Sequence, residues 1–248
     1  MKKKGKKIVF VVCAAVILFF ATVSVIYIND DYCASDFALS QVESNEKVTV
    51  SKISKNTMVF SPKEEEPDIG FIFYPGGKVQ YEAYAPLMQE IAKNGILSIL
   101  VHMPGNLAVL DSKAADGLQQ QFPKITHWYI GGHSLGGAMA AFYVSKHAKE
   151  FEGLVLLGAY STADISKTDL QVISLYGSND QVLDKKKYKK NQSHLPESFV
   201  EKVIQGGCHS YFGSYGEQDG DGKATITERE QREFTAKVLE DQMKKSKN

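Results

Sequence analysis

Eleven consecutive residues predict a strand, a sharp turn and a helix in that order: Trp128-Tyr129-Ile130-Gly131-Gly132-His133-Ser134-Leu135-Gly136-Gly137-Ala138. The apolar residues before Gly131 are typical of a buried strand, and the small and apolar residues after Ser134 are typical of a helix packed closely on a sheet. Gly132 and Gly136 lack the Cβ atoms that would collide across a tight turn between the two elements. The pattern predicts a strained serine at the end of a strand, directly before a helix N-terminus.

Such a position suits a nucleophile. The first N–H groups of a helix have no partners within it, so they favour negative charge that develops beside Ser134. The N–H of Leu135 is the first candidate donor to that charge. The alternative interpretation is a glycine-rich turn with an uninvolved serine, and the flanking strand and helix favour the nucleophile.

The rest of the chain alternates predicted strands with predicted helices. Apolar, β-branched runs predict strands at residues 48–53, 57–60, 69–74, 96–101, 127–130, 154–157, 172–176 and 199–204. Helical periodicity predicts helices at residues 81–93, 112–121, 135–148 and about 228–243. Because most of the strands are apolar throughout, the fold class is α/β, with a mostly parallel sheet that is covered on both faces.

Three more turns follow predicted strands: Tyr74-Pro75-Gly76-Gly77-Lys78-Val79, Tyr176-Gly177-Ser178-Asn179-Asp180 and Gly206-Gly207-Cys208-His209. With residues 131–137 they resemble the alpha/beta-hydrolase superfamily over roughly residues 65–243, and most closely the group called alpha/beta hydrolase fold-5. The resemblance implies an alpha/beta-hydrolase sandwich and a compact serine hydrolase similar to carboxylesterases. Only residues 158–171 lie where this fold often inserts a cap, so we expect no large cap.

A serine nucleophile needs a histidine base and a carboxylate that orients it, in the chain order Ser, Asp or Glu, His for this fold. His209 follows the predicted strand 199–204 at the carboxyl edge of the sheet, where sites of parallel sheets form. Asp180 follows the preceding strand, and its nearest rival, Asp184, is expected to begin a helix. The predicted catalytic residues are therefore Ser134, Asp180 and His209. The family alignment adds the N–H of Gly77 to that of Leu135 as the predicted oxyanion hole.

An acidic segment nearly matches a calcium-binding loop: Glu217-x-Asp219-x-Asp221-Gly222, with Glu228 at the twelfth position. It has Glu where the loop begins with Asp, and no helix is predicted to enter it. Thr227 and Glu230 are better interpreted as a capping box for the last helix. We therefore expect no metal and no cofactor.

The N-terminus carries a membrane signal. Five lysines crowd residues 1–7, and residues 8–28 contain no charge, proline or glycine, which is long enough to cross a bilayer as a helix. We expect a transmembrane anchor at residues 8–28, a linker at 29–46 and an alpha/beta-hydrolase domain at 47–248. The lysines should stay in the cytoplasm, which places the domain outside the cell membrane. A cleaved signal peptide and a secreted protein are the alternative.

The composition excludes several classes of protein. The chain has 248 residues, 43% hydrophobic and 23% charged, which is typical of one globular domain and excludes a disordered chain. Lys plus Arg equals Asp plus Glu at 29 each, so nothing indicates nucleic acid. Cys33 and Cys208 could pair on an oxidising side. The leading hypothesis is a serine hydrolase acting on a small-molecule ester; an acyltransferase and a non-catalytic binding protein remain as alternatives.

Overall fold

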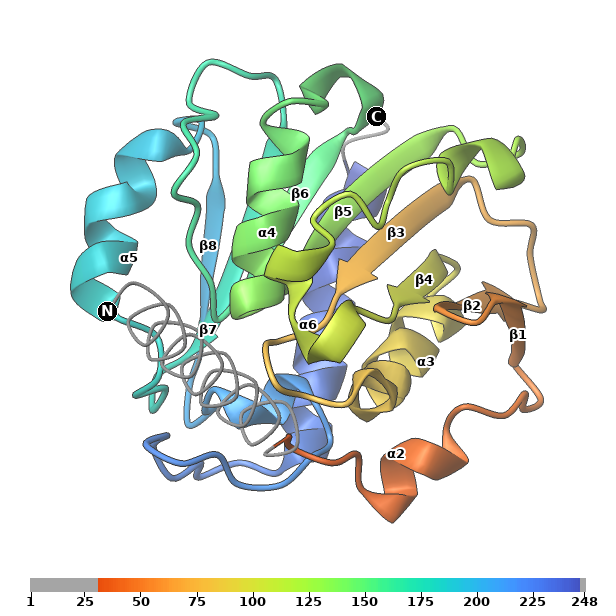
Figure 1. The fold of residues 1–248 in the computed structure, drawn as a ribbon, viewed down its shortest axis with the longest axis horizontal. Coiled ribbons are helices and arrows are strands. Elements are labelled where there is room, and N and C mark those ends of the chain that lie inside the picture. Colours follow the sequence, from red (N-terminus) through yellow and green to blue (C-terminus); the bar gives the residue numbers. More distant parts are fainter. Residues whose placement is uncertain (1–30, 246–248) are drawn as a thin grey trace, which may run out of the picture. The chain divides into compact units, whose positions relative to one another are not determined.

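The computed structural model of the chain describes residues 31–245, and the predicted anchor lies outside them. Residues 32–245 contain one eight-stranded sheet between two layers of helices (Figure 1). This confirms the predicted α/β class with a mostly parallel sheet.

The sheet has the strand order β1-β2-β4-β3-β5-β6-β7-β8. Pairing is antiparallel between β1 and β2 and between β2 and β4, and parallel in every other pair. Strands β3 to β8 therefore have their carboxyl ends at one edge of the sheet. Every strand also lies close to a position where the sequence predicts one. The strand bounds are β1 Val48–Ser54, β2 Thr57–Pro62, β3 Ile69–Tyr74, β4 Leu97–Val101, β5 His127–His133, β6 Gly153–Leu157, β7 Gln171–Gly177 and β8 Val200–Ile204.

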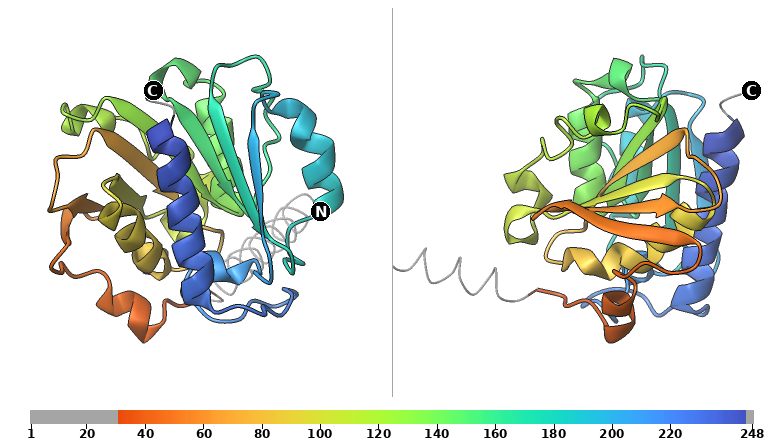
Figure 2. Two further views of the ribbon diagram at one scale, coloured as in Figure 1. Left: turned by 180° about the vertical axis from the view of Figure 1, so that it is seen from behind. Right: turned by 90° about the vertical axis from the view of Figure 1, so that its right-hand side faces the viewer.

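Helices cover both faces of the sheet, as Figure 2 shows from behind and from the side. Alternate side chains of each strand point to opposite faces. In β7, Ile173 and Leu175 join the core under α3 (Ala85–Lys93) and α6 (Glu228–Lys245). Val172 joins the opposite core, under α4 (Leu135–Val144). On that second face α5 (Lys185–Asn191) is held by a 2.9 Å hydrogen bond between the hydroxyls of Tyr188 and Ser174.

Two of the four predicted helices differ from the observed elements. The helix predicted at 112–121 was wrong: these residues form turns, with one short 3₁₀ helix at Gln119–Gln121. Gly117 has φ +76°, which a right-handed helix does not allow. The Tyr74 hydroxyl also donates a hydrogen bond to the carbonyl of Ser112 and accepts one from the N–H of Ala115. The helix predicted at 81–93 is divided into a 3₁₀ helix at Tyr81–Tyr84 and α3.

The part of the predicted linker that the structure describes is built into the domain. A short helix, α2 (Asp36–Ser40), has Ser35 as its N-cap and buries Ala38 in the core. No element of residues 158–170, between β6 and β7, is a helix or a strand, in agreement with the expected lack of a large cap. Within residues 31–245, no helix is long and apolar enough to span a membrane. No disulfide joins Cys33 and Cys208 within the described chain; Cys33 is exposed and Cys208 is buried.

Helix α6 offers a direct test of the core. Leu239 is fully buried, whereas Phe234 on the same helix is 43% exposed. Leu239→Ala should lower the free energy of unfolding by about 2–5 kcal/mol, because it leaves a cavity. Phe234→Ala should change it by no more than about 0.5 kcal/mol. Urea denaturation measures both, and equal losses would contradict this packing of α6.

Candidate active site

The Ser134 turn joins β5 to α4 as a strained elbow. Ser134 has φ +52° and ψ −121°, a conformation that few residues other than glycine adopt, and its N–H donates to the carbonyl of Leu157 at 2.9 Å. A Cβ on Gly136 would lie 2.2 Å from the carbonyl oxygens of Tyr74 and Pro75. Glycine is therefore required there, because the helix starts in contact with the end of β3.

Asp180 and His209 form a buried pair at the ends of β7 and β8. Nδ1 of His209 lies 2.8 Å from Oδ2 of Asp180, and each residue is 1% exposed. Oδ1 of Asp180 accepts the N–H groups of Val182 and Leu183 at 2.9 and 2.8 Å. With its carboxylate fixed in this way, Asp180 favours the histidine tautomer that carries its hydrogen on Nδ1. Nε2 is then the basic nitrogen, and it has no hydrogen-bond partner among the described residues.

Ser134 and His209 line the same pocket, which has a volume of about 520 Å³. The hydrogen bond between Ser134 Oγ and His209 Nε2 is not formed within the part of the chain described, as is common before substrate binds. Most of the other lining side chains are apolar: Leu135, Ala138, Met139, Ala159, Val182 and Leu183. The pocket therefore suits an apolar group next to a polar reacting centre. Tyr81, Tyr84 and residues 102–106, which follow β3 and β4, are not among the residues that line it.

Gly158 is a residue of this site that sequence reasoning missed. It follows β6 with φ +53°, and a Cβ there would lie 2.9 Å from Nδ1 of His209 and 3.3 Å from Oδ2 of Asp180. A side chain at this position would push the pair apart. Its signal in the sequence was a glycine directly after a predicted strand at the carboxyl edge.

The two predicted oxyanion residues are neighbours. A Cβ on Gly77 would lie 3.0 Å from Cδ2 and 3.4 Å from Cβ of Leu135. Within residues 31–245, neither N–H forms a hydrogen bond. Two N–H groups that have no partner among the described residues therefore belong to neighbouring residues, one in the loop after β3 and one in the first turn of α4, directly after Ser134.

A match to a protein-family model identifies the family of this chain. The model described as the alpha/beta hydrolase family matches residues 70–233. The chain belongs to the alpha/beta hydrolase family. Among solved structures, a predicted CIB-like hydrolase from Thermoplasma acidophilum is 15% identical, with a TM-score of 0.57 over 78% of this chain and 98% of its own. Est1E from Butyrivibrio proteoclasticus is 12% identical, with a TM-score of 0.58 over 81% and 98%. At these identities both show a shared fold. No curated protein matches the chain.

A second histidine of this alpha/beta hydrolase is buried beneath the site. His133, the residue before Ser134, has Nδ1 2.8 Å from the Tyr84 hydroxyl, which also accepts the Gly76 N–H at 3.0 Å. The centroids of the His133 and His209 rings are 4.4 Å apart. Burial, together with the neighbouring His209, lowers the pKa of His133 well below its usual value, so this ring stays neutral. Local sequence patterns do not predict this network, because Tyr84 and His133 lie 49 residues apart in the chain.

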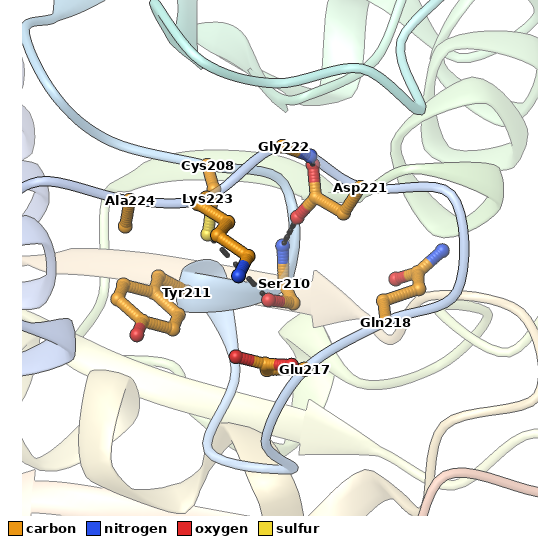
Figure 3. Close-up of a pocket in the computed structure, with 9 residues that line it drawn as sticks. All are labelled: Cys208, Ser210, Tyr211, Glu217, Gln218, Asp221, Gly222, Lys223 and Ala224. Carbon is orange, nitrogen blue, oxygen red and sulfur yellow. Dashed lines mark hydrogen bonds between the residues drawn. The ribbon is translucent and has the colours of Figure 1, made fainter.

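The acidic segment that resembles a calcium-binding loop supports the residues that follow His209. Figure 3 shows the pocket that this loop lines together with Cys208, Ser210 and Tyr211. Asp221 accepts the N–H of Ser210 at 2.9 Å and that of Gly222 at 2.8 Å, so its carboxylate holds the chain that follows His209. No group of three or more metal-binding side chains gathers within the described chain. The capping box is confirmed: Thr227 N–H donates to Glu230 at 2.7 Å, and Glu230 N–H donates to Thr227 Oγ1 at 3.2 Å.

The depressed pKa of His133 predicts a pH-dependent stability. Below about pH 6.5 the unfolded chain binds a proton at this histidine, while the folded protein does not, so the free energy of unfolding falls as the pH is lowered. In His133→Gln this dependence is absent, because glutamine does not titrate. The stability of the wild type relative to His133→Gln should therefore fall by about 1.4 kcal/mol between pH 7.5 and 5.5. Urea denaturation at both values measures it; a constant difference would show that His133 titrates normally.

Proposed function

We propose that the protein is a membrane-anchored, extracytoplasmic serine hydrolase that acts on carboxylic esters. The observation that carries the proposal is the buried Asp180–His209 pair, whose Nε2 has no partner among the described residues, in the pocket that the strained Ser134 also lines. Membership of the alpha/beta hydrolase family supports a hydrolytic reaction. The finer assignment to an ester rests on the chemistry of these residues.

In the proposed reaction Ser134 Oγ attacks the ester carbonyl carbon while its proton passes to Nε2 of His209. Asp180 keeps the ring oriented and stabilises the imidazolium that forms. The carbonyl oxygen becomes an oxyanion and accepts the N–H groups of Gly77 and Leu135. His209 then gives the proton to the departing alcohol. Water, activated by the same nitrogen, releases the acyl group and regenerates Ser134.

The pocket supports a small-molecule substrate with an apolar part. Its volume of about 520 Å³ and its mostly apolar lining, to which Tyr160, Thr162, Asp184 and Lys187 add polar groups, fit an acyl chain or an alkyl alcohol. Residues 158–170 add no cap domain over it, so an ester can reach Ser134 without a large opening movement. The proposal includes no cofactor and no nucleic-acid partner.

Activity-based labelling tests the proposal. A fluorophosphonate probe should label the full-length chain, and the wild type should hydrolyse a short-chain nitrophenyl ester. Ser134→Ala should abolish labelling, and both Ser134→Ala and His209→Ala should lower kcat by about 10⁴–10⁶-fold. Asp180→Asn should lower kcat by about 10⁴-fold, because an amide at that position favours the wrong tautomer. Ser145→Ala, just beyond α4, is the control and should behave as the wild type.

Failure of this test has distinct forms. Folded wild type that neither labels nor turns over would favour a non-catalytic binding protein. Labelling with slow hydrolysis, and faster release when an alcohol or amine is added, would indicate an acyltransferase that uses the same residues. Full turnover in Ser134→Ala would overturn the assigned nucleophile.

The membrane part of the proposal rests on the sequence of residues 1–28. The full chain should stay in the membrane fraction after an alkaline carbonate wash, and deletion of residues 1–28 should release it. External protease should reach the hydrolase domain in intact spheroplasts. Mass spectrometry of the purified protein should find the N-terminal lysines still attached. Loss of residues 1–28 from the mature chain would instead establish a cleaved signal and a secreted enzyme.

A further inference from the structure

We propose that residues 32–35, here called the N-terminal strap, position the oxyanion hole. The strap connects two loops at the carboxyl edge of the sheet: the oxyanion loop, residues 75–80, and the histidine loop, residues 205–215. The inference rests on the proposed function, and it assigns a role in catalysis to a segment whose side chains do not line the catalytic pocket.

The strap pairs with the oxyanion loop as a short parallel bridge between Tyr32 and Val79. The N–H of Tyr32 donates to the carbonyl of Lys78 at 2.7 Å, and the N–H of Gln80 donates to the carbonyl of Tyr32 at 2.9 Å. The side chain of Gln80 then accepts the N–H of Ala34 at 2.9 Å. Three hydrogen bonds therefore hold the end of the loop that carries Gly77.

Lys78 shows why this loop needs holding. It directly follows Gly77 and has φ +61°, a left-handed conformation that residues with a side chain adopt only when their surroundings impose it. Its N–H donates to the carbonyl of Asn106 at 2.9 Å, and Asn106 is itself left-handed, with φ +51°. The carbonyl of Lys78 is the group that the strap binds. Without the strap, the hydrogen bond that holds the carbonyl of Lys78 is lost.

The strap also binds the histidine loop. The N–H of Ser35 donates to the carbonyl of Ser214 at 2.8 Å, and the ring of Tyr32 lies 5.5 Å from that of Tyr215. The hydroxyl of Tyr32 accepts the N–H of Asp219 at 3.2 Å, two residues before the Asp221 that holds Ser210. The strap thus ties the loop that supplies the oxyanion donor to the loop that supplies the base.

This connection matters because oxyanion stabilisation depends on position. A donor acts when it lies about 2.7–3.1 Å from the oxyanion, and misplacement by about 1 Å can cost about 100-fold in rate. A loosened strap should therefore reduce kcat and leave ground-state binding in the apolar pocket unchanged. Any proteolytic cleavage that preserves activity must therefore occur on the N-terminal side of Tyr32, within or before residues 29–31.

Paired proline substitutions in the full-length chain test the strap. Tyr32→Pro removes the N–H that binds Lys78, and Tyr32→Ala keeps that N–H while removing the ring. Asp36→Pro is the matched control: position 36 is the first residue of α2, where proline is favoured, and Ser35 already has the extended ψ of 159° that precedes proline. Complete labelling with a fluorophosphonate counts competent sites, so kcat is expressed per labelled site and a partly unfolded sample does not distort it.

Tyr32→Pro should lower kcat by at least about tenfold, less than the ~10²–10³-fold of losing an oxyanion donor outright, with KM within about twofold of the wild type. Tyr32→Ala should lie between Tyr32→Pro and the wild type, and Asp36→Pro should match the wild type. A normal kcat per site in Tyr32→Pro, with only a lower Tm, would overturn the inference. So would an equal loss of kcat in Asp36→Pro.

Should Tyr32→Pro yield no labelled protein, Gln80→Ala decides, because it removes only the acceptor for the Ala34 N–H. About a threefold lower kcat per site is then expected, and an unchanged kcat overturns the inference. A wild type without labelling or turnover would overturn the proposed function and this inference with it. Wild-type turnover with unchanged strap variants would overturn the inference alone.

Discussion

The rest of the candidate site depends on the hydrogen bond between Asp180 and His209. Both side chains are almost completely buried, and an ionised carboxylate in such a place is stable only when its oxygens are well satisfied. Three donors do this: the imidazole at 2.8 Å and the backbone N–H groups of Val182 and Leu183. Because Asp180 is held from its own loop, the imidazole has one preferred orientation. His209 also lines the pocket that Ser134 lines.

The parallel sheet brings these groups together although they are distant in sequence. Gly77 follows β3, Ser134 follows β5, Asp180 follows β7 and His209 follows β8, and all of these strands run in the same direction. Their carboxyl ends therefore meet at one edge, as open parallel sheets require of a binding site. The close approach of α4 to β3, which only glycine at 136 permits, adds the helix N-terminus to the same edge.

The sequence predicted those parts of the structure that local patterns specify. Strands that are apolar throughout, such as β3, indicate burial on both faces. Glycine turns after β3, β5, β7 and β8 mark the carboxyl edge, so the positions of Ser134, Asp180 and His209 could be predicted. Elements that depend on distant partners could not. The turns at 112–121 replace a plausible helix because the Tyr74 hydroxyl binds their backbone. The strap lies within residues 29–46, whose mostly polar sequence is typical of a linker, and its order comes from hydrogen bonds to loops more than 40 and 170 residues away in the chain.

A crystal structure of the full-length protein after reaction with a fluorophosphonate would test the central claim most directly. The account predicts phosphorus bonded to Oγ of Ser134, with the phosphoryl oxygen about 2.7–3.1 Å from the backbone nitrogens of Gly77 and Leu135. His209 should remain paired with Asp180 and should turn Nε2 toward the adduct. An adduct on another residue, or a phosphoryl oxygen directed away from both N–H groups, would contradict the account.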